Sequence, residues 1–225
     1  MIKKKGKSSK HMKCMISPSL MCADQLRMYE EVKELVSAGS DMLHIDVMDG
    51  EFVPNIQLGT ELMKALKKSF DIPLDIHLMI QAPHRKLGYF PIGAGDTVSI
   101  HYETTPHPAR TAEMIRLAGA KALLALDPAT PVDVIGDVIP CFDGVLIMTV
   151  DPGYAGQKLI PGMIEKISRA RKMLPPGYMI EVDGNVSFEN AALMKKAGAN
   201  ALVCGSSSLF NGEYDYKTAI RILKE

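Results

Sequence analysis

The segment MLHIDVMDG, residues 42–50, indicates the fold because it combines an apolar strand with charged side chains on one face. Side chains alternate along a strand with period two. His44 and Asp46 therefore share one face, and Leu43, Ile45 and Val47 share the other. This pattern predicts a strand that packs against helices on its apolar side and directs polar groups toward a central cavity.

The rest of the chain repeats this unit of a short apolar run followed by an amphipathic stretch. The predicted strands are Met15–Leu20, Met42–Val47, Ile72–His77, Thr97–His101, Ala120–Leu126, Gly144–Thr149, Tyr178–Val182 and Ala201–Cys204. The predicted helices are Asp24–Ala38, Thr60–Phe70, His84–Ile92, Ala109–Leu117, Val132–Val138, Pro161–Leu174, Phe188–Ala197 and Tyr214–Lys224, with Asp24 as the cap of the first.

Eight β-then-α units predict a parallel sheet that closes into a single (β/α)8 TIM barrel. Three predicted helices run into glycine turns, at residues 37–40, 117–120 and 196–199, where glycine supplies a left-handed C-terminal cap. A doubly wound open sheet is the main alternative fold, but no G-x-G-x-x-G motif follows the first strand.

Composition limits the class of partner. The 225 residues include 26 basic and 26 acidic side chains, and this neutral balance gives no electrostatic footprint for nucleic acid or an anionic membrane. No apolar run is long enough to span a bilayer. The four cysteines form no C-x-x-C pair, which indicates reduced thiols in a cytoplasmic protein. We also expect a homo-oligomer.

The N-terminal segment differs from the rest of the chain. Residues 1–14 form a basic extension that contains six lysines and no apolar stretch of the signal-peptide kind. We interpret it as an extension outside the fold, with Met12 or Met15 as alternative starts, and a targeting or nucleic-acid role as the other reading. Residues 15–225 form one catalytic domain.

Polar pairs recur at the ends of other predicted strands. Asp75 and His77 share one face of their strand, and Glu181 and Asp183 share one face of theirs. In a barrel these strand ends meet, so we expect His44, Asp46, His77 and Asp183 to converge. Two imidazoles and two carboxylates suit one divalent metal ion, Zn²⁺, Mn²⁺ or Fe²⁺. Asp75 and Glu181 would lie deeper and orient these ligands.

His101, at the end of the predicted strand Thr97–His101, is expected either to contact substrate or only to fill space at the strand end.

Three turns rich in small residues predict a phosphate site. They follow the sixth, seventh and eighth predicted strands, where barrels commonly bind phosphate through backbone N–H groups and helix N-termini. The predicted phosphate-binding residues are Gly153, Tyr154, Ala155, Gly156, Gly184, Asn185, Gly205, Ser206 and Ser207.

Methionines flank the predicted metal site. Met48, Met79 and Met148 lie just past the last inward residue of their strands. Methionine is usually core filler. At a barrel mouth it could instead cushion a planar enediolate intermediate without giving it a proton, so we expect these three side chains to contact substrate.

Together these motifs resemble the ribulose-phosphate 3-epimerase family. The resemblance runs from Met15 to the C-terminus and is carried by ISPSL (16–20), HIDVMDG (44–50), FVPN (52–55), HLM (77–79), MTVDPG (148–153) and EVDG (181–184). It implies a metal held by His44, Asp46, His77 and Asp183, with Asp46 and Asp183 as the acid–base pair. It also implies that Ser19 and His77 contact substrate and that the three turns bind phosphate.

The residues suit that chemistry. Inverting the carbon beside a carbonyl requires removal of a proton on one face and its return on the other, which two carboxylates can perform. A metal ion would stabilise the negative charge of the enediolate.

Three segments point to a branch of the family. Residues 21–24 (MCAD), 151–157 (DPGYAGQ) and 205–211 (GSSSLFN) look more like D-allulose-6-phosphate 3-epimerases than like the ribulose branch. The favoured reaction is therefore D-allulose 6-phosphate to D-fructose 6-phosphate, with D-ribulose 5-phosphate to D-xylulose 5-phosphate as the alternative. A barrel decarboxylase or aldolase would need a lysine at a strand end, and none of the eight predicted strands ends in one. A non-catalytic sugar-phosphate binder would have lost one of the two acids, and both Asp46 and Asp183 are present.

Overall fold

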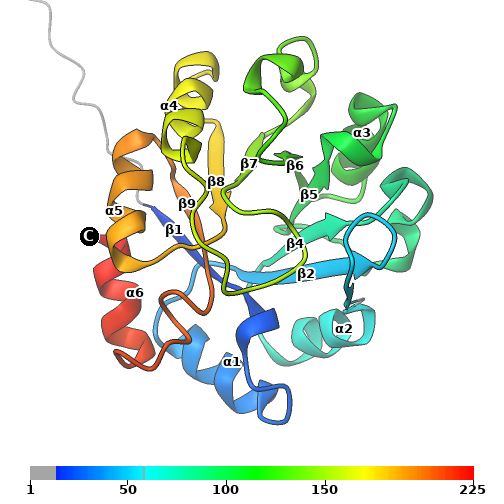
Figure 1. Ribbon diagram of the computed structural model, residues 1–225. Helices are drawn as coiled ribbons and strands as arrows, with labels where there is room; N and C mark the ends of the chain where they lie inside the picture. Colours follow the sequence, from blue (N-terminus) through cyan, green and yellow to red (C-terminus); the bar gives the residue numbers. More distant parts are fainter. Residues whose placement is uncertain (1–13, 58) are drawn as a thin grey trace, which may run out of the picture.

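A computed structural model describes residues 14–57 and 59–225, in which nine strands form one curled sheet with helices around it (Figure 1). The strand order is β1-β9-β8-β7-β6-β5-β4-β2-β3, and every neighbouring pair is parallel except β2 with β3. The strands are β1 (Met15–Pro18), β2 (Leu43–Asp49), β3 (Ile56–Gln57), β4 (Leu74–Met79), β5 (Thr97–His101), β6 (Lys121–Leu126), β7 (Gly144–Met148), β8 (Met179–Asp183) and β9 (Ala201–Cys204).

The sheet curls far enough to bring its first strand back to its second. Ser19, just past β1, forms a parallel bridge with His44 of β2. The fold is therefore of the TIM-barrel-like α/β type. Cys14 of the predicted extension is buried beside β1, and the remainder of that segment lies outside the described residues.

Helices cover the outer face of the sheet. They are α1 (Met28–Ser37), α2 (Thr60–Ser69), α3 (Pro108–Leu117), α4 (Met163–Met173), α5 (Phe188–Ala197) and α6 (Tyr216–Lys224). Each buries an apolar stripe, as Val32 and Leu35 do in α1, and each such side chain contributes roughly 1.5–3 kcal/mol. The glycines of the three predicted turns, Gly39, Gly119 and Gly198, all have positive φ, as their role at helix ends requires.

Three local predictions are wrong, and one short strand was not predicted. The segments 84–92 and 132–138 contain only short 3-10 helices, Pro83–Arg85, Leu87–Tyr89 and Val132–Ile135. Gly88 and Pro91 disfavour a longer helix in the first segment, and Gly136 and Pro140 do so in the second. Asp24 does not cap α1. Its carboxylate accepts a hydrogen bond from the backbone of Leu26 instead. The two-residue β3, antiparallel to β2, was not expected.

The interior of the curled sheet holds buried polar side chains as well as two small apolar clusters. Ser17, His44, Asp75, His77 and Glu181 are fully buried there, whereas the outward residues of the same strands belong to the apolar core. Unpaired charge is costly in such a place, so these groups must be matched to one another. Within the described part of the chain, none of the helices has the length and hydrophobicity needed to cross a bilayer.

Gly144, which lies between its sheet neighbours Leu123 and Met179, allows β7 and β8 to approach closely. A Cβ at this position would lie 2.3 Å from the carbonyl oxygen of Met179 and 2.7 Å from its Cβ. We expect Gly144→Ala to lower the free energy of unfolding by about 1–3 kcal/mol, since the strands must separate. A Cβ at Gly136 would lie 3.6 Å from its nearest neighbours. Gly136→Ala should therefore change the free energy of unfolding by less than about 1 kcal/mol. Urea unfolding followed by circular dichroism measures both, and equal midpoints for Gly144→Ala and the wild type would contradict this.

Candidate active site

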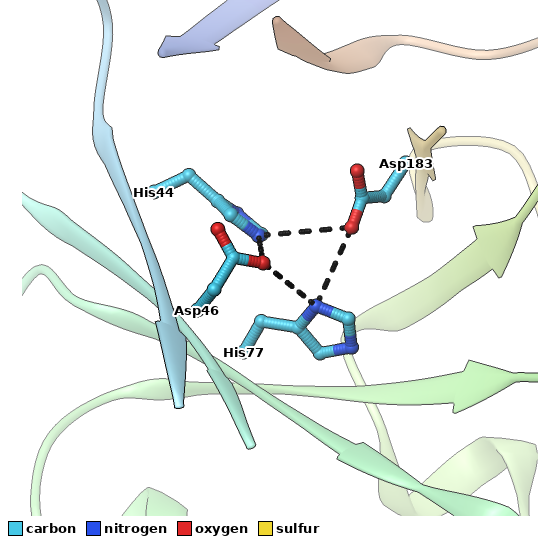
Figure 2. A group of neighbouring side chains, drawn as sticks. All are labelled: His44, Asp46, His77 and Asp183. Carbon is cyan, nitrogen blue, oxygen red and sulfur yellow. Dashed lines mark ion pairs between the residues drawn. The ribbon is translucent and has the colours of Figure 1, made fainter. Parts of the chain in front are cut away.

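Four side chains from β2, β4 and β8 point toward one another at the carboxyl ends of these strands (Figure 2). The Nε2 atom of His44 lies 3.4 Å from Asp46 Oδ1 and 3.9 Å from Asp183 Oδ2. The Nδ1 atom of His77 lies 3.8 Å from Asp46 Oδ1 and 3.5 Å from Asp183 Oδ2. All four facing atoms lie within 4.8 Å of one another. The structure thus brings together the four residues predicted from strand parity.

The cluster fits a divalent cation. Among the described residues, His44 Nε2 and His77 Nδ1 are buried without a hydrogen-bond partner, and both face the centre of the group. A buried polar atom without a partner is costly, so these lone pairs need something to bind. Two imidazole nitrogens and two carboxylate oxygens are ligands that Zn²⁺, Mn²⁺ and Fe²⁺ accept.

The deeper acids lie against this cluster. Asp75 Oδ2 is 2.6 Å from His44 Nδ1 and accepts a hydrogen bond of 2.8 Å from the hydroxyl of Ser17. A proton held on Nδ1 of His44 by Asp75 leaves Nε2 free to face the centre. Glu181 completes a second group with His44 and Asp75, as its place one residue pair below Asp183 predicts.

Burial and pairing set the charges. Without a cation, burial works against a charged His44, but Asp75 and Asp46 outweigh it and raise the pKa of His44 above its usual range. A cation at the centre would take the place of the second proton on Nε2. Burial also opposes the Asp46 carboxylate, but His44 and His77 outweigh it and lower the pKa of Asp46. Burial, followed by the charge of Asp75, raises the pKa of Glu181 well above its usual value, which favours a neutral carboxyl.

The sequence left His101 as a substrate contact or a filler, and the structure places its ring among polar partners. Its ring is fully buried, and its Nε2 lies 2.8 Å from Nε2 of His77. Its Nδ1 lies 2.9 Å from Asp127 and 3.4 Å from Glu103. These acids outweigh the cost of burial and raise the pKa of His101. The signal was present in the sequence, because His101 and Glu103 repeat the spacing of the other polar pairs and Asp127 directly follows β6.

One pocket opens above the cluster and is lined by Asp46, Asp183, Ser19 and all three of the predicted methionines. Met48, Met79 and Met148 are each at most 2% exposed. The same pocket is lined by the residues predicted for phosphate: Gly153, Tyr154, Ala155, Gly156, Gly184, Asn185, Gly205, Ser206 and Ser207. The hydroxyl of Ser19 donates a 2.7 Å hydrogen bond to Asp46 Oδ2, which places it beside one of the two acids.

Several of the residues that line the pocket also form hydrogen bonds that join its loops to one another. The Asn185 amide donates to the carbonyl of Gln157 at 2.8 Å and to the Ser207 hydroxyl at 3.3 Å, so it links the three turns. The Tyr154 hydroxyl donates to the carbonyl of Pro54. Gly184 has φ 115°, and a Cβ there would lie 2.6 Å from Val150, so the position requires glycine.

Helix N-termini contribute unequally to the predicted anion site. The turn after β8 leads into α5, whose first residue, Phe188, is preceded by the cap Ser187. The turn after β9 does not lead directly into a helix, because α6 begins only at Tyr216. The third turn therefore offers backbone N–H groups without an adjacent helix dipole.

Two residues of the 44–55 segment support the site in ways that the sequence analysis did not assign. Asp49 accepts hydrogen bonds from the backbone of Glu51, Phe52 and Gln81 and from Lys86. Partial burial opposes its charge, but these donors outweigh it and lower the pKa of Asp49 to about 2. Asn55 donates to the carbonyl of Gly153 at 2.9 Å, which joins this segment to the first phosphate turn.

Comparison with known proteins adds the family. The model of the ribulose-phosphate 3 epimerase family matches residues 15–210. A protein of Bacillus subtilis named ribulose-phosphate 3-epimerase is 43% identical over 209 residues, which cover 91% of this chain and 95% of the relative. A chloroplastic ribulose-5-phosphate-3-epimerase of Arabidopsis thaliana is 44% identical over 214 residues, which cover 93% of this chain and 75% of the relative.

Solved structures add only the fold, because their sequence identity is low. A mutant tryptophan synthase α-subunit from Pyrococcus furiosus superposes with a TM-score of 0.62 at 16% identity, covering 95% of this chain and 96% of that chain. An orotidine 5′-phosphate decarboxylase from Pyrococcus horikoshii has a TM-score of 0.61 at 16% identity, covering 93% and 97%.

We expect the chain, once stripped by a chelator, to bind about one divalent ion at this cluster. His77→Ala should weaken Zn²⁺ binding by more than about 100-fold, because loss of a direct ligand costs more than loss of a group that orients one. His107→Ala, on an exposed histidine outside the cluster, is the matched control and should leave the affinity unchanged. Isothermal titration calorimetry measures both, and a wild-type chain that binds no divalent ion would refute the assignment.

Proposed function

The chain belongs to the ribulose-phosphate 3-epimerase family, and from that premise we propose that it interconverts D-ribulose 5-phosphate and D-xylulose 5-phosphate by inverting C3. The observation that carries the proposal is the pair of carboxylates, Asp46 and Asp183. Their oxygens lie within 4.8 Å of each other and of two unpaired histidine nitrogens, at the floor of a pocket with phosphate-type turns.

Asp46 and Asp183 are the proposed acid–base pair. Asp46 comes from β2 and Asp183 from β8, so they approach the centre from different strands. The histidines keep Asp46 ionised, so in one direction Asp46 removes the C3 proton and Asp183 returns a proton to the other face. The reverse direction exchanges these roles. The Asp183 side chain is 18% exposed, which gives it proton exchange with the pocket water.

The other residues orient the substrate and protect the intermediate. A divalent cation held by His44, Asp46, His77 and Asp183 would supply positive charge that stabilises an enediolate. Ser19 holds Asp46 in place through its hydroxyl. Met48, Met79 and Met148 line the pocket without offering an acidic proton, which protects a planar intermediate from stray protonation. The three turns bind the phosphate through backbone N–H groups.

Different observations favour each of the two candidate substrates. The sequence favours D-allulose 6-phosphate, because residues 151–157 and 205–211 depart from the pattern of the ribulose branch. The names of the relatives favour the five-carbon substrate, and the alignments with these relatives cover nearly the whole chain. We therefore place D-ribulose 5-phosphate first and keep D-allulose 6-phosphate as the second candidate. The proposal includes a closed (β/α)8 barrel, a single domain over residues 15–225, a homo-oligomer and a cytoplasmic location.

The two-base assignment predicts complementary defects. Asp46→Asn and Asp183→Asn should each lower kcat for epimerisation by about 10²–10⁴-fold, because each face then lacks its proton carrier. Each variant should still exchange the C3 hydrogen of one epimer with solvent, and the two variants should act on opposite epimers. Nuclear magnetic resonance of C3-deuterated D-ribulose 5-phosphate and D-xylulose 5-phosphate measures this wash-out, with Asp151→Asn as the pocket-lining control. Wash-out from the same epimer in both variants would rule out the assignment.

The substrate proposal predicts a preference. We expect kcat/KM for D-ribulose 5-phosphate to exceed that for D-allulose 6-phosphate by at least about tenfold, or about 1.4 kcal/mol, since the span between the acids and the phosphate turns suits one length better. Coupled assays on one metal-loaded preparation measure both values. A preference for the six-carbon substrate would select the second candidate, and Asp151→Asn with Tyr154→Phe and Ala155→Gly should then reduce it. Turnover of neither substrate would refute the proposed function.

A further inference from the structure

A buried line of contacts leads away from the cluster into β5 and β6. Nε2 of His77 lies 2.8 Å from Nε2 of His101, and the two ring planes are 19° apart. On its other side the His101 ring presents Nδ1 to Asp127, at 2.9 Å, and to Glu103, at 3.4 Å. Both imidazoles are fully buried, whereas the side chains of the two acids are 21% and 23% exposed. None of these contacts involves the pocket that holds the substrate in the proposed function.

The order of groups in this line restricts where the protons can be. The carboxylates can only accept, so they favour a proton on Nδ1 of His101. A neutral His101 then has a lone pair on Nε2, which can accept only if Nε2 of His77 carries a proton. A neutral His77 protonated on Nε2 has its lone pair on Nδ1, the atom that faces Asp46 and Asp183 without a partner.

We propose that His101, oriented by Asp127 and Glu103, is a positioning residue that accepts a hydrogen bond from Nε2 of His77 and so keeps Nδ1 of His77 free as a metal ligand. The inference rests on the metal site of the proposed function. It assigns a role to three side chains from β5 and the segments after β5 and β6 that the epimerisation mechanism does not otherwise use.

The surroundings hold this line in place. Lys166 of α4 is 1% exposed, and its ammonium donates to the carbonyl of Asp127 at 2.5 Å. Glu103 accepts from the backbone N–H of Asp127 at 3.0 Å and from the hydroxyl of Thr130. The Phe52 ring lies 4.8 Å from that of His101. The contacts of Lys166 and Thr130 hold Asp127 and Glu103 in fixed positions, so that the two acids can orient His101.

Two substitutions at one position separate positioning from packing. His101→Leu removes the acceptor for His77, whereas His101→Gln supplies an amide oxygen that can replace it. Ser99→Ala is the matched control, because Ser99 lies on the same strand, is fully buried and has no hydrogen-bond partner for its hydroxyl among the described residues. Neither of these two positions belongs to the four proposed ligands.

The first measurement is the tautomer of each ring in the Zn²⁺-loaded wild-type chain, because the raised pKa of His101 favours a second proton on that ring when no cation is bound. Long-range ¹H–¹⁵N spectra of histidine-labelled protein distinguish a proton on Nδ1 from one on Nε2. We expect His77 to carry its proton on Nε2 and His101 on Nδ1. A proton on Nδ1 of His77, or a doubly protonated His101, would overturn the proposal whatever the activity of the enzyme.

The second measurement is calorimetric titration of each stripped variant with Zn²⁺, with the melting temperature of the same metal-free samples as a check on folding. We expect His101→Leu to weaken Zn²⁺ binding by about 10–100-fold, and His101→Gln and Ser99→Ala to stay within about threefold of the wild type. Wild-type affinity in His101→Leu would overturn the inference. A wild-type chain that binds Zn²⁺ but does not epimerise would instead refute the proposed function alone, and one that binds no divalent ion would refute both.

Discussion

The burial of ionisable side chains inside the curled sheet is the constraint on which the rest of the structure depends. Asp75 and Glu181 are fully buried, and Asp46 nearly so, where an isolated carboxylate would be very costly. Asp75 is paired with His44 and Ser17, and Asp46 with the histidines and Ser19. For Glu181, burial and the charge of Asp75 raise the pKa and favour the neutral form. Among the described residues, His44 Nε2 and His77 Nδ1 are two of the buried atoms that have no hydrogen-bond partner. Both face one point between the four side chains, and this point is the candidate metal site.

The loops above the strands meet a different constraint, because their backbone N–H groups must be able to approach an anion closely. Backbone N–H groups can surround an anion only where side chains are small, and the turns after β7, β8 and β9 meet this need with glycine and serine. Small residues alone would leave these turns free to move apart. Asn185 joins the turns to one another, and Asn55 and Tyr154 join the first turn to the segment that follows β2. The segment that carries His44 and Asp46 thereby also positions the opposite end of the pocket.

Strand parity made much of the site predictable, because it is a local property of the chain. The pairs His44 with Asp46 and Glu181 with Asp183 follow from period two alone, and a parallel barrel then brings the strand ends together. The segments 84–92 and 132–138 were predicted as full helices, because amphipathic spacing does not reveal that glycine and proline interrupt a helix. The start of α1 was predicted too early, because Asp24 forms a local turn with Leu26 before the helix begins at Met28. The partner of His101 was missed for a different reason. His77 lies opposite Ser99 in the sheet, so its contact with His101 is diagonal and depends on register and ring orientation, which sequence spacing does not contain.

The two histidines of the candidate metal site present opposite ring nitrogens to its centre, and their depths explain why. His44 lies opposite Asp75, and Asp46 lies opposite His77, so His44 is one residue pair deeper than His77. The deeper ring must reach upward with its distal nitrogen, Nε2, and its proximal Nδ1 then meets an acid at its own level on the neighbouring strand. The shallower ring already lies at the centre and uses Nδ1, so its distal Nε2 extends away toward β5. The residue of β5 opposite His77 is Ser99, whose hydroxyl has no hydrogen-bond partner among the described residues. An imidazole one residue pair higher has the length to span the gap, and it passes the orienting effect of the acids on its far side to His77.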